Sequence, residues 1–118
     1  MTSRGDVVVA VFPYVGGGAS KNRPAVVVQC DRLNRQLQNT VVVMVTGNTR
    51  LVGREPTQFL IEPATAEGQS SGLAHASAVK CENLMTIAQT DILRTLGHLS
   101  SVLMDQLNDC LKVALELP

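Results

Sequence analysis

The chain has very few aromatic residues and no tryptophan. Phe12, Tyr14 and Phe59 are its only rings in 118 residues. Single-strand binding modules that stack bases on aromatic platforms need more rings than this, so the composition argues against that mode of nucleic-acid binding. The core must be aliphatic. With 45% hydrophobic and 17% charged residues, the chain has the composition of a globular protein.

Long apolar runs and paired cysteines are also missing. The longest early apolar run, 7–12, is too short for a signal-peptide core or a membrane span. Cys30, Cys81 and Cys110 are odd in number and far apart, with no C-x-x-C spacing, which indicates a reducing compartment. We therefore expect a soluble cytoplasmic protein, and the length predicts one domain over 1–118.

The net charge is zero, so there is no overall attraction to nucleic acid. The charges are unevenly distributed. Residues 1–54 hold seven cationic and two acidic residues, whereas residues 55–118 hold three cationic and eight acidic ones. This asymmetry indicates an anion-binding first half, unless the two halves interleave in space and their fields cancel.

The hydrophobic pattern predicts a sheet in the first two thirds of the chain. Short connections between the apolar runs favour antiparallel strands. Residues 31–39 predict a polar turn or one helical turn, and 64–72 predict a surface loop. Strands are expected at 7–12, 24–30, 40–46 and 57–62, with further short strands at 73–79 and 84–87.

The period becomes helical after Thr90. Apolar residues at helical spacing between 92 and 99 predict a short helix that Thr90 caps and Gly97 ends. Ser100 then caps a longer helix with one apolar face, which should pack on the sheet. Strands followed by helices predict an α+β fold with a strongly curved or barrel-like sheet and a C-terminal amphipathic helix.

A glycine-rich loop at 16–20 leads into Lys21-Asn22-Arg23-Pro24, where a strand should begin. The glycines predict a mobile surface loop, and Pro24 suits the first residue of a strand. An arginine at that position presents a planar fork of donors that fits phosphate oxygens, and Lys21 adds a second cation. The alternative is a solvated loop with two ordinary surface cations.

Several familiar catalytic motifs are absent. His75 and His98 have no ligand spacing near them, so neither a metal nor a cofactor is expected. The glycine run is not a P-loop, because it lacks the second glycine before Lys21 and has Asn22 where Ser or Thr should follow. No G-x-S-x-G nucleophile elbow is present.

Four polar residues at strand ends remain as candidates: Arg23, Thr46, Lys80 and Glu82. Metal-free cleavage of a phosphodiester requires a base, an acid and donors for the charged phosphorane. In RNA the 2′-hydroxyl can be the nucleophile, so no catalytic Ser or Cys is needed. An arginine, a threonine and a carboxylate would be enough. The alternative for Thr46 is a β-favouring residue that closes a strand.

At these residues the sequence resembles the MazF/PemK family of toxins from type II toxin-antitoxin systems, which includes the Kid toxin. The resemblance follows the family's order over nearly the full length. It implies a compact SH3-like or CcdB-like antiparallel barrel, a homodimer, and sequence-specific, metal-independent cleavage of single-stranded RNA such as mRNA. The products would be a 2′,3′-cyclic phosphate and a 5′-hydroxyl. The matching segments are 4–8, the glycine loop, 23–28, the strand ending at Thr46, 84–87 and 96–99.

The resemblance also implies residue roles. Arg23 matches the catalytic arginine, which serves as acid/base and phosphorane donor, and Thr46 matches the threonine that orients the phosphate. Lys80-Cys81-Glu82 stands where Kid-like members have a functional Arg-Cys-Asp triplet, which makes Glu82 a catalytic candidate. Substrate binding is expected from Lys21, Asn22, Gly47, Asn48 and Lys80.

The sequence departs from the family pattern at three places. The loop lacks the glutamate usually found near Gly18, and Met85 and Ala88 replace the usual Arg and Asp around the later Thr-Ile. Activity or base preference is therefore expected to differ. The expected partner is an antitoxin with a partly disordered, acidic and apolar tail that blocks Arg23. The alternative is a non-catalytic protein on this fold, either a gyrase poison or a degenerate toxin that only binds an antitoxin.

Overall fold

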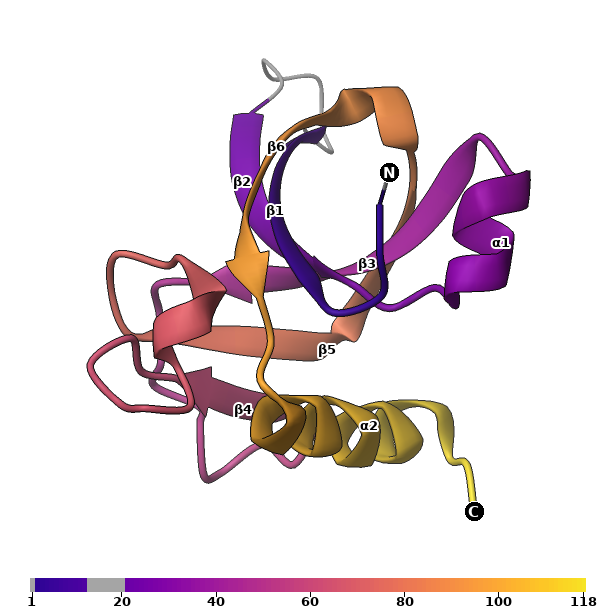
Figure 1. Ribbon diagram of the computed structural model, residues 1–118. Helices are drawn as coiled ribbons and strands as arrows, with labels where there is room; N and C mark the ends of the chain where they lie inside the picture. The colour runs from indigo at the N-terminus through magenta and orange to yellow at the C-terminus, as the bar shows by residue number, and fades with distance from the viewer. Residues whose placement is uncertain (1, 13–20) are drawn as a thin grey trace.

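A computed structural model describes residues 2–12 and 21–118, so the predicted glycine loop at 16–20 lies outside the described residues. One antiparallel sheet has the strand order β4-β5-β3-β2-β1-β6 and curls into a half-barrel, with helix α2 lying across one end (Figure 1). This confirms the predicted α+β fold. The elements are β1 (Asp6–Phe12), β2 (Lys21–Val27), α1 (Asp31–Gln36), β3 (Asn39–Thr46), β4 (Gln58–Ile61), β5 (Ser77–Ala88), β6 (Ile92–His98) and α2 (Ser101–Leu115), with 3-10 turns at Gln69–Ser71 and Gln89–Asp91.

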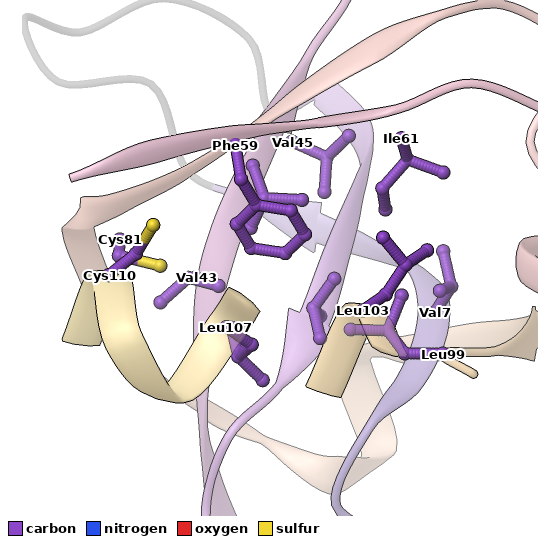
Figure 2. Close-up of a cluster of buried hydrophobic side chains, with 12 residues drawn as sticks. Val7, Val43, Val45, Phe59, Ile61, Cys81, Leu99, Leu103, Leu107 and Cys110 are labelled. Atoms are coloured by element: carbon purple, nitrogen blue, oxygen red, sulfur yellow. The ribbon is translucent and has the colours of Figure 1, made fainter. Parts of the chain in front are cut away.

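The sheet carries an apolar cluster on each face, because successive side chains of a strand point to opposite sides. On β3, Val42 belongs to one cluster and Val43 to the other. The first cluster lies between the sheet and α2 (Figure 2), and the second fills the inside of the curl. The buried members of both clusters are aliphatic apart from Phe12, Phe59, Cys81 and Cys110, as the scarcity of aromatic residues predicts.

Helix α2 forms where the sequence predicts it. The Ser100 hydroxyl accepts a hydrogen bond from the Leu103 N–H at 3.3 Å, which caps the first turn. Leu103, Leu107 and Cys110 recur at helical spacing and are buried against the sheet. The helix ends at Glu116, whose left-handed backbone lets its N–H donate to carbonyls of the last turn. No helix within the described ranges is long and apolar enough to cross a membrane.

The short helix predicted between residues 92 and 99 is wrong. These residues form β6, which pairs antiparallel with β1 and forms the edge of the sheet beyond it. The leucine spacing is compatible with a helix, but hydrogen bonding to the edge of β1 decides the conformation. Gly97 does not end a helix. A Cβ atom there would lie 2.1 Å from the Ser70 carbonyl oxygen, so the residue is small because the neighbouring turn approaches closely.

Residues 77–79 and 84–87, predicted within two short strands, belong to one strand, β5, which is interrupted by an irregularity, whereas residues 73–76 are not strand. Val43 of β3 pairs with Leu84, but the next residue, Met44, pairs with Lys80. The three residues of β5 between these partners bulge from the ladder, and they include Glu82. This bulge takes Glu82 out of regular pairing with β3.

Strand β2 begins earlier than predicted, at Lys21 instead of Pro24, and ends at Val27. Pro24 pairs with Val9 of β1, whereas the ladder to β3 begins only at Ala25. The prolyl nitrogen therefore lies where β2 has a partner on one side alone, which is where a strand tolerates proline. The predicted loop at 64–72 is confirmed as irregular chain with a 3-10 turn, although Ser71 within it is buried.

Candidate functional site

Arg23 and Thr46 lie on the same face of the sheet. Ala25 of β2 pairs with Met44 of β3, and each candidate residue lies two positions beyond that pair on its strand. Side chains alternate, so Arg23 shares the face of Ala25 and Thr46 shares the face of Met44. Arg23 is exposed and Thr46 is half-buried. Two donors from separate segments are therefore presented to solvent on one side of the sheet.

Lys80 extends this polar face across two more strands. It pairs with Met44 on β3 and with Gln58 on β4. A hollow of about 70 Å³ is lined by Thr46, Asn48, Leu51, Gln58 and Lys80. The Thr46 hydroxyl accepts a hydrogen bond from the Asn48 N–H at 3.2 Å. The structure thus brings together three predicted site residues, Thr46, Asn48 and Lys80.

Glu82 is held at the edge of this face by two donors. Its carboxylate accepts hydrogen bonds from Thr57 Oγ1 at 3.0 Å and from Gln58 Nε2 at 2.7 Å. Partial burial by itself would raise the pKa of Glu82. The hydrogen bonds from Gln58, from its own backbone N–H and from Thr57, together with the Lys80 charge, outweigh burial and lower the pKa below its usual value. Glu82 is therefore ionised at neutral pH.

The cations of the first half are not equivalent. Within residues 2–12 and 21–118, the Arg23 guanidinium makes no hydrogen bond or ion pair, so its donors are available to a ligand. Arg4 instead has a structural role. Its Nε donates to the Val28 carbonyl at 2.9 Å and its terminal nitrogen to Asn108 Oδ1 at 2.7 Å, which joins the start of the chain to α2.

The predicted site residues Asn22 and Gly47 lie elsewhere. They line a groove of about 580 Å³ with Val9, Pro24 and Leu96. Because Asn22 and Pro24 alternate with Arg23 along β2, this groove opens on the other face of the sheet from the polar face. Lys21, the exposed first residue of β2, lies two positions from Arg23 and therefore on the same face of the sheet. The structure therefore divides the predicted substrate residues between two surfaces.

Neither histidine belongs to a metal-ligand cluster. His98 is the last residue of β6, and its Nδ1 lies 2.9 Å from Asp6 Oδ1. His75 lines the groove. In the part of the chain that the structure describes, no three His, Cys, Asp or Glu side chains gather closely enough to hold a metal ion.

Sequence reasoning missed Thr57 and Gln58, the two residues that hold Glu82. Gln58 is the first residue of β4 and Thr57 directly precedes it, and both are buried. Their burial, which is unusual for a glutamine, is not visible in the sequence. The partner of Gln58 could not be read from the sequence either, because the pairing of Gln58 with Lys80 depends on the register of β4 against β5.

Comparisons with known proteins agree with this architecture. The curated relatives include endoribonuclease MazF9 of Mycobacterium tuberculosis, 31% identical over 99% of this chain and 98% of the relative. Endoribonuclease EndoA of Bacillus subtilis is 27% identical over 99% and 97%.

Solved structures share the fold. An endoribonuclease in complex with its cognate antitoxin from a mycobacterial species matches with a TM-score of 0.77 and 24% identity, over 100% of this chain and 98% of that chain. A MazE–MazF structure from Deinococcus radiodurans matches with a TM-score of 0.74 and 15% identity, over 99% and 98%. The family model described as PemK-like, MazF-like toxin of type II toxin-antitoxin system matches residues 3–115. With this match over nearly its whole length, the chain belongs to the PemK-like, MazF-like toxins of type II toxin-antitoxin systems.

Proposed function

We propose that this protein is a cytoplasmic endoribonuclease toxin that cleaves single-stranded RNA, such as mRNA, at specific sequences without a metal ion. The relatives named as endoribonucleases support the activity. The observation that carries the mechanism is the polar face, where the Arg23 guanidinium, unpaired among the described residues, and the Thr46 hydroxyl share one side of the sheet. We propose Arg23, Thr46 and Glu82 as the catalytic residues.

The proposed reaction is attack of a ribose 2′-hydroxyl on the adjacent phosphorus, which expels the 5′-oxygen and leaves a 2′,3′-cyclic phosphate. Arg23 donates to the phosphorane oxygens and protonates the leaving oxygen, and Thr46 orients the phosphate. Glu82 acts as an acceptor for the 2′-hydroxyl proton, since a carboxylate with a lowered pKa is ionised but is a poor acid. Lys21, Lys80 and Asn48 bind flanking phosphates and riboses.

The groove on the other face is suited to the antitoxin. Apolar side chains such as Val9 and Leu96 line it, and Asn22, His75 and Arg94 supply polar groups. This combination fits an acidic, apolar peptide tail. The tail would then lie on the face opposite Arg23, in contrast to the expectation from the sequence that it covers Arg23 directly. A solved mycobacterial relative of the same fold is in complex with its cognate antitoxin. We propose that a cognate antitoxin neutralises this protein and that the toxin is a homodimer.

The nuclease is tested with purified protein, a mixed-sequence single-stranded RNA and EDTA. We expect discrete fragments that end in a 2′,3′-cyclic phosphate and a 5′-hydroxyl. A single 2′-deoxy nucleotide at a mapped cleavage site should block cleavage there, because it removes the nucleophile. Arg23→Ala should lower the cleavage rate by at least about 100-fold. Arg35→Ala, which removes an exposed cation on α1, is the matched control and should cleave normally.

Intact RNA at high protein concentration would contradict the nuclease and favour a non-catalytic toxin. Equal activity of Arg23→Ala and the wild type would contradict the assigned site alone. Cleavage that requires added Mg²⁺ would contradict the metal-free mechanism. Purification of the toxin with the product of an adjacent small open reading frame, and loss of cleavage in that complex, would support the antitoxin proposal.

A further inference from the structure

Two cysteine thiols meet in the core between β5 and α2. Cys81 is 0% exposed and Cys110 is 8% exposed. Figure 2 shows the two side chains next to each other where the strand meets the helix. The two thiols are near enough for each to influence the pKa of the other. The other members of this cluster have carbon side chains only, so the sulfurs have each other as polar neighbours within it.

We propose that Cys81 and Cys110 are a reversible dithiol–disulfide pair that fastens α2 to β5 when a small-molecule disulfide, such as oxidised glutathione, oxidises it. A disulfide requires two cysteines that lie next to each other, and Cys81 and Cys110 share one buried cluster between packed elements. Neither residue is needed for the proposed cleavage of RNA. The inference is therefore independent of the proposed function.

Oxidation proceeds by two exchange steps. The Cys110 thiolate attacks one sulfur of the small disulfide, which forms a mixed disulfide and releases one small thiolate. Cys81 then loses its proton to solvent and attacks the Cys110 sulfur. The bond between Cys81 and Cys110 forms, and a second small thiolate leaves. Two protein thiols are oxidised while one small disulfide is reduced to two thiols.

Cys110 is the point of entry. It is the more exposed of the two, and it lies in the second half of α2, near the exposed end of the chain. Burial raises the pKa of both thiols, but the neighbouring Cys81 thiol partly offsets this rise at Cys110. Reaction with a bulky disulfide requires transient opening of the last turns of α2, so oxidation of the native protein should be slow.

The link would close a loop that contains all of β6 and join α2 to the strand bearing the polar face. Cys81 lies between Lys80 and Glu82 in the bulge of β5. The main consequence of oxidation is therefore a more stable attachment of α2 at this point. By thermodynamic linkage, if folding raises the equilibrium constant for disulfide formation, the disulfide raises the equilibrium constant for folding by the same factor.

The test uses the full chain with Cys30→Ser, because exposed Cys30 could otherwise form links between molecules. The protein is equilibrated in mixtures of reduced and oxidised glutathione, natively and in concentrated urea. Intact mass should reveal the loss of two hydrogen atoms, and peptide mapping should place the bond between Cys81 and Cys110. We expect the equilibrium constant for disulfide formation to be on the order of a hundredfold higher in the native protein than in urea.

A second variant, Cys30→Ser with Cys110→Ala, controls for the pairing. It should form no internal disulfide and should take up glutathione at most slowly at Cys81. The proposal is overturned if the disulfide is no more favoured in the native protein than in urea, or if it forms in urea and prevents refolding. Glutathione bound at Cys110 without closure to Cys81 at equilibrium would overturn it as well.

Discussion

The Gln58 amide donates from Nε2 to Glu82 Oε2 over 2.7 Å, which joins the start of β4 to the bulge of β5. Thr57 donates to the other carboxylate oxygen at 3.0 Å. These bonds favour the ionised carboxylate more than burial opposes it, so the pKa of Glu82 is lowered. The same group is the proposed proton acceptor, and its environment therefore makes both stability and activity depend on pH.

Glu82→Gln should lower the free energy of unfolding at neutral pH and have little effect in acid. A carboxyl whose pKa is lowered by folding contributes stability above its unfolded-state pKa, and that contribution is lost as pH falls through the folded-state pKa. Urea midpoints of the wild type and the variant should therefore differ at neutral pH and converge as the pH falls below the ordinary range of a glutamate. Glu67→Gln, on an exposed loop, is the matched control. A constant difference across this range would contradict the assignment.

The lowered pKa also predicts the acid limb of the cleavage reaction. A proton acceptor must be deprotonated, and Glu82 remains so until the pH falls below the ordinary range of a glutamate. Protonation of Glu82 should therefore not lower the single-turnover cleavage rate between neutral pH and about pH 5. Glu82→Gln should be slower throughout this range. An acid limb above pH about 5 that Glu82→Gln abolishes would contradict the lowered pKa.

Two substitutions at Thr46 test whether its hydroxyl, and not merely its side-chain volume, is needed for cleavage. Thr46→Val keeps the shape but removes the group that orients the phosphate, so cleavage should fall by about 10- to 1000-fold. Thr46→Ser keeps the hydroxyl and should retain most activity. The valine variant also loses the hydrogen bond from the Asn48 N–H, at a cost of about 1 kcal/mol. Single-turnover cleavage and urea unfolding of both variants measure the two effects. Equal rates for the two variants would exclude a role for the hydroxyl.

Much of the fold follows from local sequence patterns. The apolar runs predict β1, β3 and β4 closely, and the Ser100 cap with its amphipathic pattern predicts α2. The α+β half-barrel follows from these elements. The identity of β6 does not, because its apolar residues fit a helix equally well and only the edge of β1 selects the strand.

The candidate site is less predictable, because it depends on register. That Arg23 and Thr46 share a face follows from the pairing of Ala25 with Met44. The bulge in β5, the bond from Gln58 to Glu82 and the neighbouring thiols all require knowledge of long-range pairing, which a single sequence does not contain. The catalytic assignments remain predictions until the variants are measured.

Gly5 should tolerate a side chain less well than Gly53 does. Its φ of +91° is unfavourable for other residues, and a Cβ there would lie 2.8 Å from Met104 Sδ and 3.1 Å from the His98 ring. Gly53 also has a positive φ, of +85°, but its Cβ would meet nothing within 4 Å. Gly53→Ala should therefore lower the free energy of unfolding by about 1 kcal/mol, from backbone strain alone. Gly5→Ala should lower it by about 3 kcal/mol, because the close contacts add to that strain. Urea unfolding measures both, and equal losses would mean that the contact to α2 carries no cost.

The three thiols should differ sharply in reactivity. Cys30 is exposed, whereas burial, with smaller contributions from Cys110 and Glu82, raises the pKa of Cys81 to about 12. Burial and the Asp109 charge raise the pKa of Cys110 as well. Because the thiolate is the nucleophile, native protein should label rapidly at one site only, and labelling of Cys81 should follow the rate at which the core opens. Mass spectrometry of iodoacetamide-treated protein, with urea as the fully reactive control, measures this. Rapid native labelling at all three sites would show that the packing of α2 on β5 does not protect the pair.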